Sequence, residues 1–259
     1  MSFGTKRVLA LESRRAAEIA ELIRKNGGEP FVAPSMRETP IEANDAVFRF
    51  ADGLSSGAFE MVILLTGVGT RQLRRVLGDR FVVGLRHVTI VARGPKPAAA
   101  LREMGLAPAL TAPEPNTWRE VLQVIDGRPE RRIAVQEYGR SNPELLDGLR
   151  AKGAEVTAVR IYQYGLPEDP EPLREAARRL AAGEFDVVLF TTAVQMEHLA
   201  RVARDQGIEE AALDHLRRAM VCSIGPTTTE ALEEFSVHPR LEPSHPKMGI
   251  LVREAAERA

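Results

Sequence analysis

Two stretches of the sequence place hydroxyl side chains where an apolar run meets a helical pattern. In IGPTTTEAL, Thr227 and Thr228 stand near the start of a helical pattern, and in DVVLFTT, Thr191 and Thr192 end an apolar run. The first turn of a helix leaves backbone N–H groups without partners and carries the positive end of the helix dipole, so it attracts anions. Hydroxyl donors at such positions indicate a site for carboxylate or phosphate groups. A single threonine there can equally be an N-cap, worth about 1 kcal/mol.

The first half of the chain repeats these features. Thr66 follows the apolar run MVILL, and Arg93 and Gly94 precede a helical pattern in RGPKPAAAL. Gly225 has the same place in IGPTTTEAL as Gly94 has in its own segment. In parallel sheets, ligands bind at the carboxyl ends of the strands, where loops lead into helices. The four loops together therefore favour a shared ligand cleft over a set of separate caps.

Two of the three tyrosines lie in the segment VRIYQY. The phenol of Tyr162 is a hydrogen-bond donor that could act as an acid toward a bound ligand. Tyr162 could instead be an aromatic residue packed within a strand. The residues alone leave both interpretations open.

Motifs for metal or cofactor chemistry are absent from the sequence. It has no glycine-rich dinucleotide or P-loop motif, no GxSxG elbow and no metal-binding histidine spacing. The single cysteine, Cys222, lies in an apolar stretch and is expected to be buried. His198 and His215 lie on helical stretches and are expected at the surface. We therefore expect a cofactor-free enzyme or a binding protein, without a metal.

Charge and hydropathy indicate which classes of binding partner the protein can have. The formal net charge of the 259 residues is −1, which gives no broad basic field for nucleic acid or an anionic membrane. No apolar run approaches membrane-spanning length, and the N-terminus lacks the apolar core of a signal peptide. We expect a cytoplasmic protein that acts on a small molecule, with neither nucleic acid nor membrane as a partner.

Short β-branched runs alternate with helical patterns along the chain, which is typical of α/β folds with parallel sheets. The predicted strands are residues 7–11, 30–33, 61–66, 88–92, 109–111, 132–136, 156–164, 186–190 and 220–224. The predicted helices are residues 14–25, 45–54, 70–77, 98–104, 118–125, 144–151, 173–182, 196–218, 228–235 and 249–257.

An internal repeat indicates two similar domains. RVLALES begins at Arg7 and RIAVQEY at Arg132, 125 residues further on, and MVILLTG at Met61 and DVVLFTT at Asp186 have the same separation. Two proline-containing segments resemble a pair of interdomain linkers. This arrangement favours a domain built from the middle of the chain and inserted into a domain built from its two ends.

Together these features resemble the uroporphyrinogen-III synthase family. The similarity runs over essentially the whole chain and rests on the threonine-bearing strand ends, the IGPTTTEAL turn and the segment VRIYQY after LDGLRAKGAEV. The resemblance implies two similar parallel-sheet, flavodoxin-like α/β domains joined by a two-stranded linker, one inserted in the other. The expected bounds are residues 1–36 plus 166–259 for the first domain, 41–160 for the inserted domain, and about 34–42 and 160–172 for the linkers.

The resemblance also implies a reaction. Linear hydroxymethylbilane loses its hydroxyl group as water, and its last pyrrole ring is inverted through a spiro intermediate during ring closure. Tyr162 matches the tyrosine that helps the hydroxyl to leave, so it is the candidate catalytic residue. The substrate carboxylates are expected in the interdomain cleft, on the candidate binding residues Thr66, Arg93, Gly94, Gly139, Arg140, Ser141, Thr191, Thr192, Gly225, Thr227 and Thr228. A monomer without a cofactor is implied, open to transient contact with the enzyme that makes the bilane.

The sequence departs from the family pattern in places, and two other functions are compatible with it. The usual Thr-Ser of the first strand end is Thr66-Gly67 here, and Pro97 stands where the corresponding turn usually has a threonine. A non-catalytic two-domain protein that binds a small anion would share the fold and the anion sites. A sugar-nucleotide transferase with a similar cleft is the weaker alternative.

Overall fold

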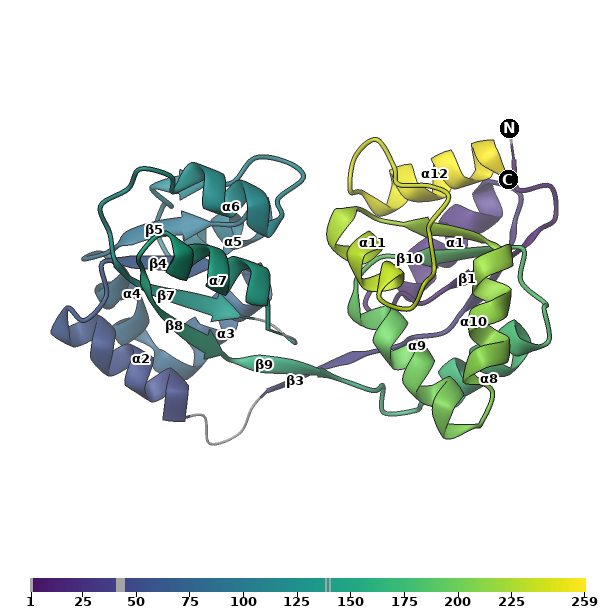
Figure 1. Ribbon diagram of the computed structural model, residues 1–259, viewed down its shortest axis with the longest axis horizontal. Helices are drawn as coiled ribbons and strands as arrows, with labels where there is room; N and C mark the ends of the chain where they lie inside the picture. Colours follow the sequence, from purple (N-terminus) through teal and green to yellow (C-terminus); the bar gives the residue numbers. More distant parts are fainter. Residues whose placement is uncertain (1, 41–44, 138, 140) are drawn as a thin grey trace. The chain divides into compact units, whose positions relative to one another are not determined.

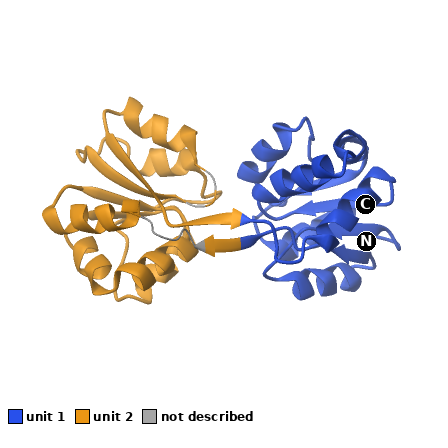
Figure 2. Ribbon diagram, turned by 90° about the horizontal axis from the view of Figure 1, so that it is seen from below, with its two compact units in different colours: residues 1–37, 165–259 blue, residues 38–164 orange. Residues whose placement is uncertain are grey.

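The computed structural model describes residues 2–40, 45–137, 139 and 141–259. The chain divides into unit 1, residues 1–37 with 165–259, and unit 2, residues 38–164 (Figure 2). Unit 2 is therefore an insertion in unit 1, for which the sequence predicts the bounds 41–160. No helix in the described ranges is long and apolar enough to span a bilayer.

Unit 1 is a parallel sheet with helices on both faces (Figure 1). The order of its four strands is β11-β10-β1-β2. These strands are β1 (Arg7–Ala10), β2 (Glu29–Val32), β10 (Val187–Phe190) and β11 (Met220–Ser223). The helices are α1 (Ala16–Lys25), α8 (Glu171–Ala181), α9 (Val194–Asp205), α10 (Glu209–Arg218), α11 (Pro226–Glu233) and α12 (Met248–Arg258).

Both faces of this sheet are buried, as expected for a parallel sheet. Along β1 and the residue after it, Leu9 and Leu11 belong to one core cluster, whereas Val8 and Ala10 belong to another. The first cluster contains residues of α8, α9 and α10, and the second contains residues of α1 and α12. Successive side chains of a strand point to opposite faces, so a continuous apolar run supplies both helical layers.

Unit 2 has the same layered architecture with one more strand. Its parallel sheet has the order β6-β5-β4-β7-β8. The strands are β4 (Met61–Leu64), β5 (Thr89–Ala92), β6 (Leu110–Thr111), β7 (Arg132–Glu137) and β8 (Glu155–Arg160). The helices are α2 (Asp45–Ser56), α3 (Gly67–Leu77), α4 (Asp79–Leu85), α5 (Pro95–Arg102), α6 (Trp118–Val124) and α7 (Pro143–Ala151). Residues of α2, α3 and α4 pack on one face of the sheet, and residues of α6 and α7 pack on the other.

Two strands carry the chain between the units. β3 (Arg37–Pro40) leads into unit 2 and β9 (Tyr162–Gly165) leads back, and the two pair as a separate sheet (Figure 1). The predicted two-stranded linker is therefore confirmed.

The strand orders confirm the internal repeat. The sequence β11-β10-β1-β2 in unit 1 corresponds to β5-β4-β7-β8 in unit 2. Arg7 and Arg132, the first residues of β1 and β7, are the residues that the sequence repeat aligns. Each unit thus combines the start of one repeat with the end of the other. The prediction of two similar α/β domains, one inserted in the other, is confirmed.

Some predicted elements differ from the structure. The single strand predicted for residues 156–164 is wrong, since β8 pairs with β7 and β9 pairs with β3 in another sheet. The helix predicted for residues 196–218 is interrupted between α9 and α10, where Gly207 has a φ of 71°. The short helix α4 was not predicted.

Candidate active site

Thr66 follows β4 and caps helix α3. Its Oγ1 accepts a hydrogen bond from the backbone N–H of Gly69 at 3.0 Å and lies 3.1 Å from Oη of Tyr162. The N–H of Thr66 donates to Oε1 of Gln136 at 3.2 Å. Thr66 is therefore an N-cap whose hydroxyl also contacts a tyrosine.

Gln136 is a buried site residue that the sequence analysis missed. Its side chain is 1% exposed and comes from β7, the strand beside β4. Its oxygen accepts the N–H of Thr66, and its nitrogen donates to the carbonyl of Glu137. A Cβ atom on Gly69 would clash with the Gln136 amide, so glycine allows α3 to begin directly against this side chain. Gln136 could have been identified as a polar residue at the end of the predicted buried strand 132–136.

Tyr162 lies in the interior of unit 2. Its side chain is 2% exposed and packs in a core cluster with Val159 and Ile161. Its ring meets the ring of Tyr164 edge-on, with centroids 5.6 Å apart. The structure therefore shows a packed strand aromatic whose hydroxyl has a polar partner, Thr66, at the carboxyl end of β4.

A buried carboxylate organises the loop after β7. Glu137 is 3% exposed and accepts hydrogen bonds from the hydroxyl of Ser141 at 2.8 Å and from the next backbone N–H at 3.1 Å. Gly139 has a φ of 55°, and its N–H donates to the carbonyl of Tyr162 at 3.2 Å. Arg140 lies outside the described residues. The hydroxyl of Ser141 is thus directed toward a carboxylate of the protein itself.

The backbone of the loop after β5 lies close to the side-chain amide of Asn116. A Cβ atom on Gly94, which precedes α5, would lie 2.5 Å from the amide of Asn116. The amide nitrogen of Asn116 donates to the carbonyls of Arg93 and Ala112 at 3.2 and 3.1 Å. Glycine at position 94 therefore lets this loop pass over Asn116.

Gln195 and Glu12 hold the loop after β10 in unit 1. Oε1 of Gln195 accepts the N–H groups of Thr191 at 2.7 Å and Thr192 at 3.2 Å. Its Nε2 donates to the carbonyl of Leu11 at 3.0 Å and to Oγ1 of Thr191 at 2.9 Å. The hydroxyl of Thr191 in turn donates to Glu12 at 2.7 Å. Gln195, which is 0% exposed, was not among the predicted site residues.

Helix α11 begins at the turn after β11. Its N-cap is Gly225, whose carbonyl accepts the N–H groups of Thr228 and Thr229. The alternative interpretation of Thr227 or Thr228 as the N-cap is therefore wrong. Within the described residues, neither the Thr227 nor the Thr228 hydroxyl makes a hydrogen bond, whereas that of Thr229 donates to Glu242.

The predicted residues gather within each unit. In unit 2, hydrogen bonds connect Thr66 to Tyr162 and Tyr162 to Gly139, and the N–H of Arg93 donates to the carbonyl of Leu64 at 3.0 Å. In unit 1, the N–H of residue 224 donates to the carbonyl of residue 190, which places the β11 loop beside the β10 loop. The expectation that both groups serve one ligand remains a prediction.

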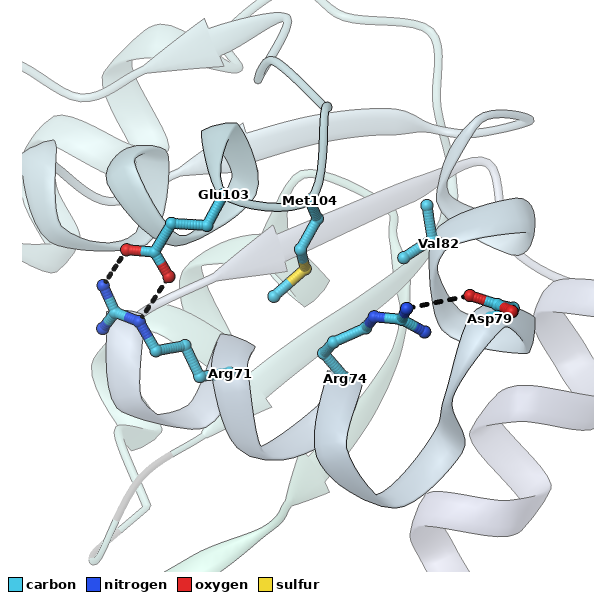
Figure 3. A pocket seen from close by; sticks show the side chains of 6 residues that line it. All are labelled: Arg71, Arg74, Asp79, Val82, Glu103 and Met104. Atoms are coloured by element: carbon cyan, nitrogen blue, oxygen red, sulfur yellow. Dashed lines mark hydrogen bonds and ion pairs between the residues drawn. The ribbon is translucent and has the colours of Figure 1, made fainter.

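Unit 2 also has a cavity of about 460 Å³, and Figure 3 shows the side chains around it. It is lined by Arg71, Arg74, Asp79, Val82, Glu103 and Met104. Arg71 donates to Glu103 through two nitrogens, at 2.8 and 2.6 Å, and Arg74 lies 2.8 Å from Asp79. The hydrogen bond from Arg71 lowers the pKa of Glu103. Each arginine of this cavity is thus paired with a carboxylate of the protein.

Two buried titratable groups lie elsewhere in unit 1. His198 is 7% exposed, so its expected surface position is wrong; its Nδ1 lies 2.7 Å from the carbonyl of Ser35, and burial lowers its pKa. Cys222 is buried as predicted, and burial raises its pKa to about 12. Across the described ranges, no cluster of three or more His, Cys, Asp or Glu side chains is arranged to hold a metal ion.

A protein-family model described as uroporphyrinogen-III synthase HemD matches residues 17–253. The chain belongs to this family. The predicted resemblance is confirmed, and so is its extent over most of the chain.

Relatives of this family member span nearly its full length. A protein of Bacillus subtilis named "Uncharacterized protein YjjA" is 30% identical over 260 residues, 97% of this chain and 95% of the relative. A protein of Methanothermobacter thermautotrophicus named "Putative uroporphyrinogen-III synthase" is 31% identical over 228 residues, 86% of this chain and 87% of the relative. The crystal structure of a mutant uroporphyrinogen III synthase from Thermus thermophilus has a TM-score of 0.75 at 28% identity, covering 98% of this chain and 100% of that one.

Proposed function

We propose that this family member is a uroporphyrinogen-III synthase, a lyase that closes hydroxymethylbilane with inversion of its last pyrrole ring and loss of water. The match of the family model to residues 17–253 carries this proposal. The repeated units support it, because each has helices that begin at the carboxyl ends of parallel strands, where carboxylates bind.

In the proposed reaction, the phenol of Tyr162 assists the loss of the substrate hydroxyl. The C–O bond of the hydroxymethyl group breaks, the phenolic proton completes a water molecule, and an azafulvenium cation and a phenolate remain. The substituted carbon of the last ring attacks the cation and forms a spiro intermediate. The bond from this carbon to the methylene bridge of the third ring then breaks and leaves an azafulvenium cation on the third ring. The unsubstituted carbon of the last ring attacks that methylene group and closes the macrocycle. The proton lost from that carbon returns to the phenolate, so atoms and charges balance.

We infer that the strand-end loops bind the substrate carboxylates. Thr192, Thr227 and Thr228 support this inference, because their hydroxyls make no hydrogen bond within the described part of the chain. The hydroxyls of Thr66 and Thr191 are engaged within their own units and would have to exchange these bonds for a substrate contact. The proposed set is completed by Arg93, Gly94, Gly139, Arg140, Ser141 and Gly225.

An isomer assay tests the function. Hydroxymethylbilane is generated in situ, the protein is added, and the products are oxidised and separated into uroporphyrins I and III. We expect mainly the type III isomer, whereas the bilane alone closes to type I. If a protein preparation with a folded circular-dichroism spectrum leaves only type I, the proposal is wrong and an anion-binding protein is the better interpretation.

A further inference from the structure

The hydroxyl of Thr66 joins several elements of unit 2. It accepts the N–H of Gly69 in α3 at 3.0 Å and lies 3.1 Å from Oη of Tyr162 in β9. The backbone of Thr66 is held from β7, because its N–H donates to the 1% exposed side chain of Gln136. Thr66 is therefore fixed from two directions at the point where it meets the phenol.

Packing fixes the ring of Tyr162 but not its hydroxyl hydrogen. The side chain is 2% exposed within a core cluster, and Tyr164 contacts its ring edge-on. A phenolic hydrogen can still rotate about the C–O bond to suit its hydrogen-bond partners. A hydroxyl held at 3.1 Å from the phenol oxygen therefore influences where that hydrogen points.

The equivalent threonine of unit 1 does not contact a phenol. The carbonyl of Phe190 accepts the N–H of Ile224, as that of Leu64 accepts the N–H of Arg93. Thr192 therefore corresponds to Thr66, and its hydroxyl makes no hydrogen bond within the described residues. A buried glutamine accepts the threonine N–H in both units, Gln136 from a strand and Gln195 from a helix. Anchoring of the strand-end threonine is thus common to both units, whereas the contact with a phenol belongs to unit 2.

We propose that Thr66 is a positioning residue for the phenol of Tyr162 and that Gln136 supports it by fixing its backbone. This inference rests on the proposed function, in which Tyr162 gives a proton to the departing hydroxyl of the bilane. In this role the Thr66 hydroxyl donates to Oη of Tyr162 and the phenolic hydrogen points away from Thr66, toward the departing hydroxyl, so the effect of Thr66 on the reaction passes through Tyr162. This role differs from a direct contact with a substrate carboxylate.

A kinetic double-mutant cycle tests the inference, with formation of the type III isomer as the readout. We expect Tyr162→Phe to lower kcat by about 100-fold, a typical loss for a proton donor. Thr66→Val should lower kcat by about 10-fold, the equivalent of roughly one hydrogen bond, with KM within about twofold of wild type. In the Tyr162→Phe background, Thr66→Val should change kcat by less than about twofold, because the group that it positions is already gone.

Three variants separate positioning from damage to the fold. Thr66→Ser keeps the hydroxyl and should retain most of the wild-type kcat. Thr70→Val removes a buried hydroxyl that donates to the carbonyl of Thr66 at 2.8 Å, and it should leave kcat near the wild-type value. Gln136→Leu introduces the residue that unit 1 has at the equivalent position, Leu11, and should lower kcat in the direction of Thr66→Val.

Several outcomes would overturn the inference. A higher KM with unchanged kcat in Thr66→Val, or a loss that adds to that of Tyr162→Phe, makes Thr66 a substrate contact. Equal losses of kcat in Thr70→Val and Thr66→Val would assign the effect to the start of α3, and full activity in Tyr162→Phe would remove the group to be positioned. A wild-type protein that yields only type I isomer contradicts the proposed function itself. Type III formation that is equally fast in wild type and Thr66→Val contradicts the positioning role alone.

Discussion

Replacing Gln195 by methionine should destabilise unit 1 markedly, because this 0% exposed side chain makes four hydrogen bonds. Methionine has a similar length and volume, so the change removes polar contacts and leaves little cavity. The N–H groups of Thr191 and Thr192 lose their acceptor, and the hydroxyl of Thr191 loses a donor. The carbonyl of Leu11 keeps a hydrogen bond from Ser35 at 2.8 Å.

The expected loss follows from these contacts. Four neutral hydrogen bonds at about 1 kcal/mol each amount to about 4 kcal/mol. Burial of the methionine side chain does not carry the desolvation cost of burying an amide, which offsets roughly 1–2 kcal/mol of this loss. The free energy of unfolding should therefore fall by about 2–3 kcal/mol, which lowers the Tm by about 6–9 °C for a unit of this size.

Thermal and urea unfolding of wild type and Gln195→Met measure this loss. Gln206→Met is the matched control near the end of the same helix, where a more accessible glutamine donates to the carbonyl of Val202 at 3.0 Å. Water can replace the contacts of Gln206, so its variant should lose less than about 1 kcal/mol. A Gln195→Met variant that loses no more than this control would refute the reasoning.

Four further predictions concern other groups. Gly69→Ala should cost about 2 kcal/mol, because its Cβ would overlap the buried amide of Gln136, whereas Gly249→Ala, with open space around it, should be neutral or stabilising in the same urea titration. The lowered pKa of His198 means that the unfolded chain binds this proton more readily, so the free energy of unfolding should fall as the pH drops below about 6.5. Urea unfolding between pH 7 and 5 measures this, and the same change of the unfolding free energy with pH in wild type and His198→Gln would contradict it. Cys222, with its pKa raised to about 12, should not react with a disulfide reagent at pH 8 until the protein is unfolded, and rapid reaction of the native protein would show that its burial is wrong. The pair Thr227→Ala and Thr228→Ala should raise KM for the bilane by about 10-fold or more, and an unchanged KM would mean that these hydroxyls do not bind substrate.

The fold could be predicted from the sequence because its signals are regular. The runs that begin at Arg7 and Arg132 became β1 and β7, and the separation of 125 residues predicted which parts of the chain form each sheet. The break near Ile161 could not be seen, since an extended chain can pass from one sheet into another without a change in composition. Pairing partners, which the local sequence does not specify, decide where such a strand ends.

The candidate site could be predicted only in part. The threonines at strand ends were visible, but their anchors were not, because the two units place the anchoring glutamine on different elements. Gln136 corresponds to Leu11 of unit 1, and Gln195 corresponds to Gly69 of unit 2, so comparing the repeats hides both. His198 was misplaced because α9 packs against α8, α10 and α11 and therefore buries more than one face.

The insertion of unit 2 between β2 and β10 affects how the protein is made. Unit 2 has all its strands as soon as residue 164 is synthesised, whereas β1 waits for β10, whose Val187 pairs with Val8. At about 5–20 residues per second, the roughly 150 residues between β2 and β10 take about 8–30 s to synthesise. During that interval one apolar edge of β1 is unpaired, and such edges promote aggregation. Synthesis of β10, late in the chain, therefore determines when the edge of β1 is protected from association with other nascent chains.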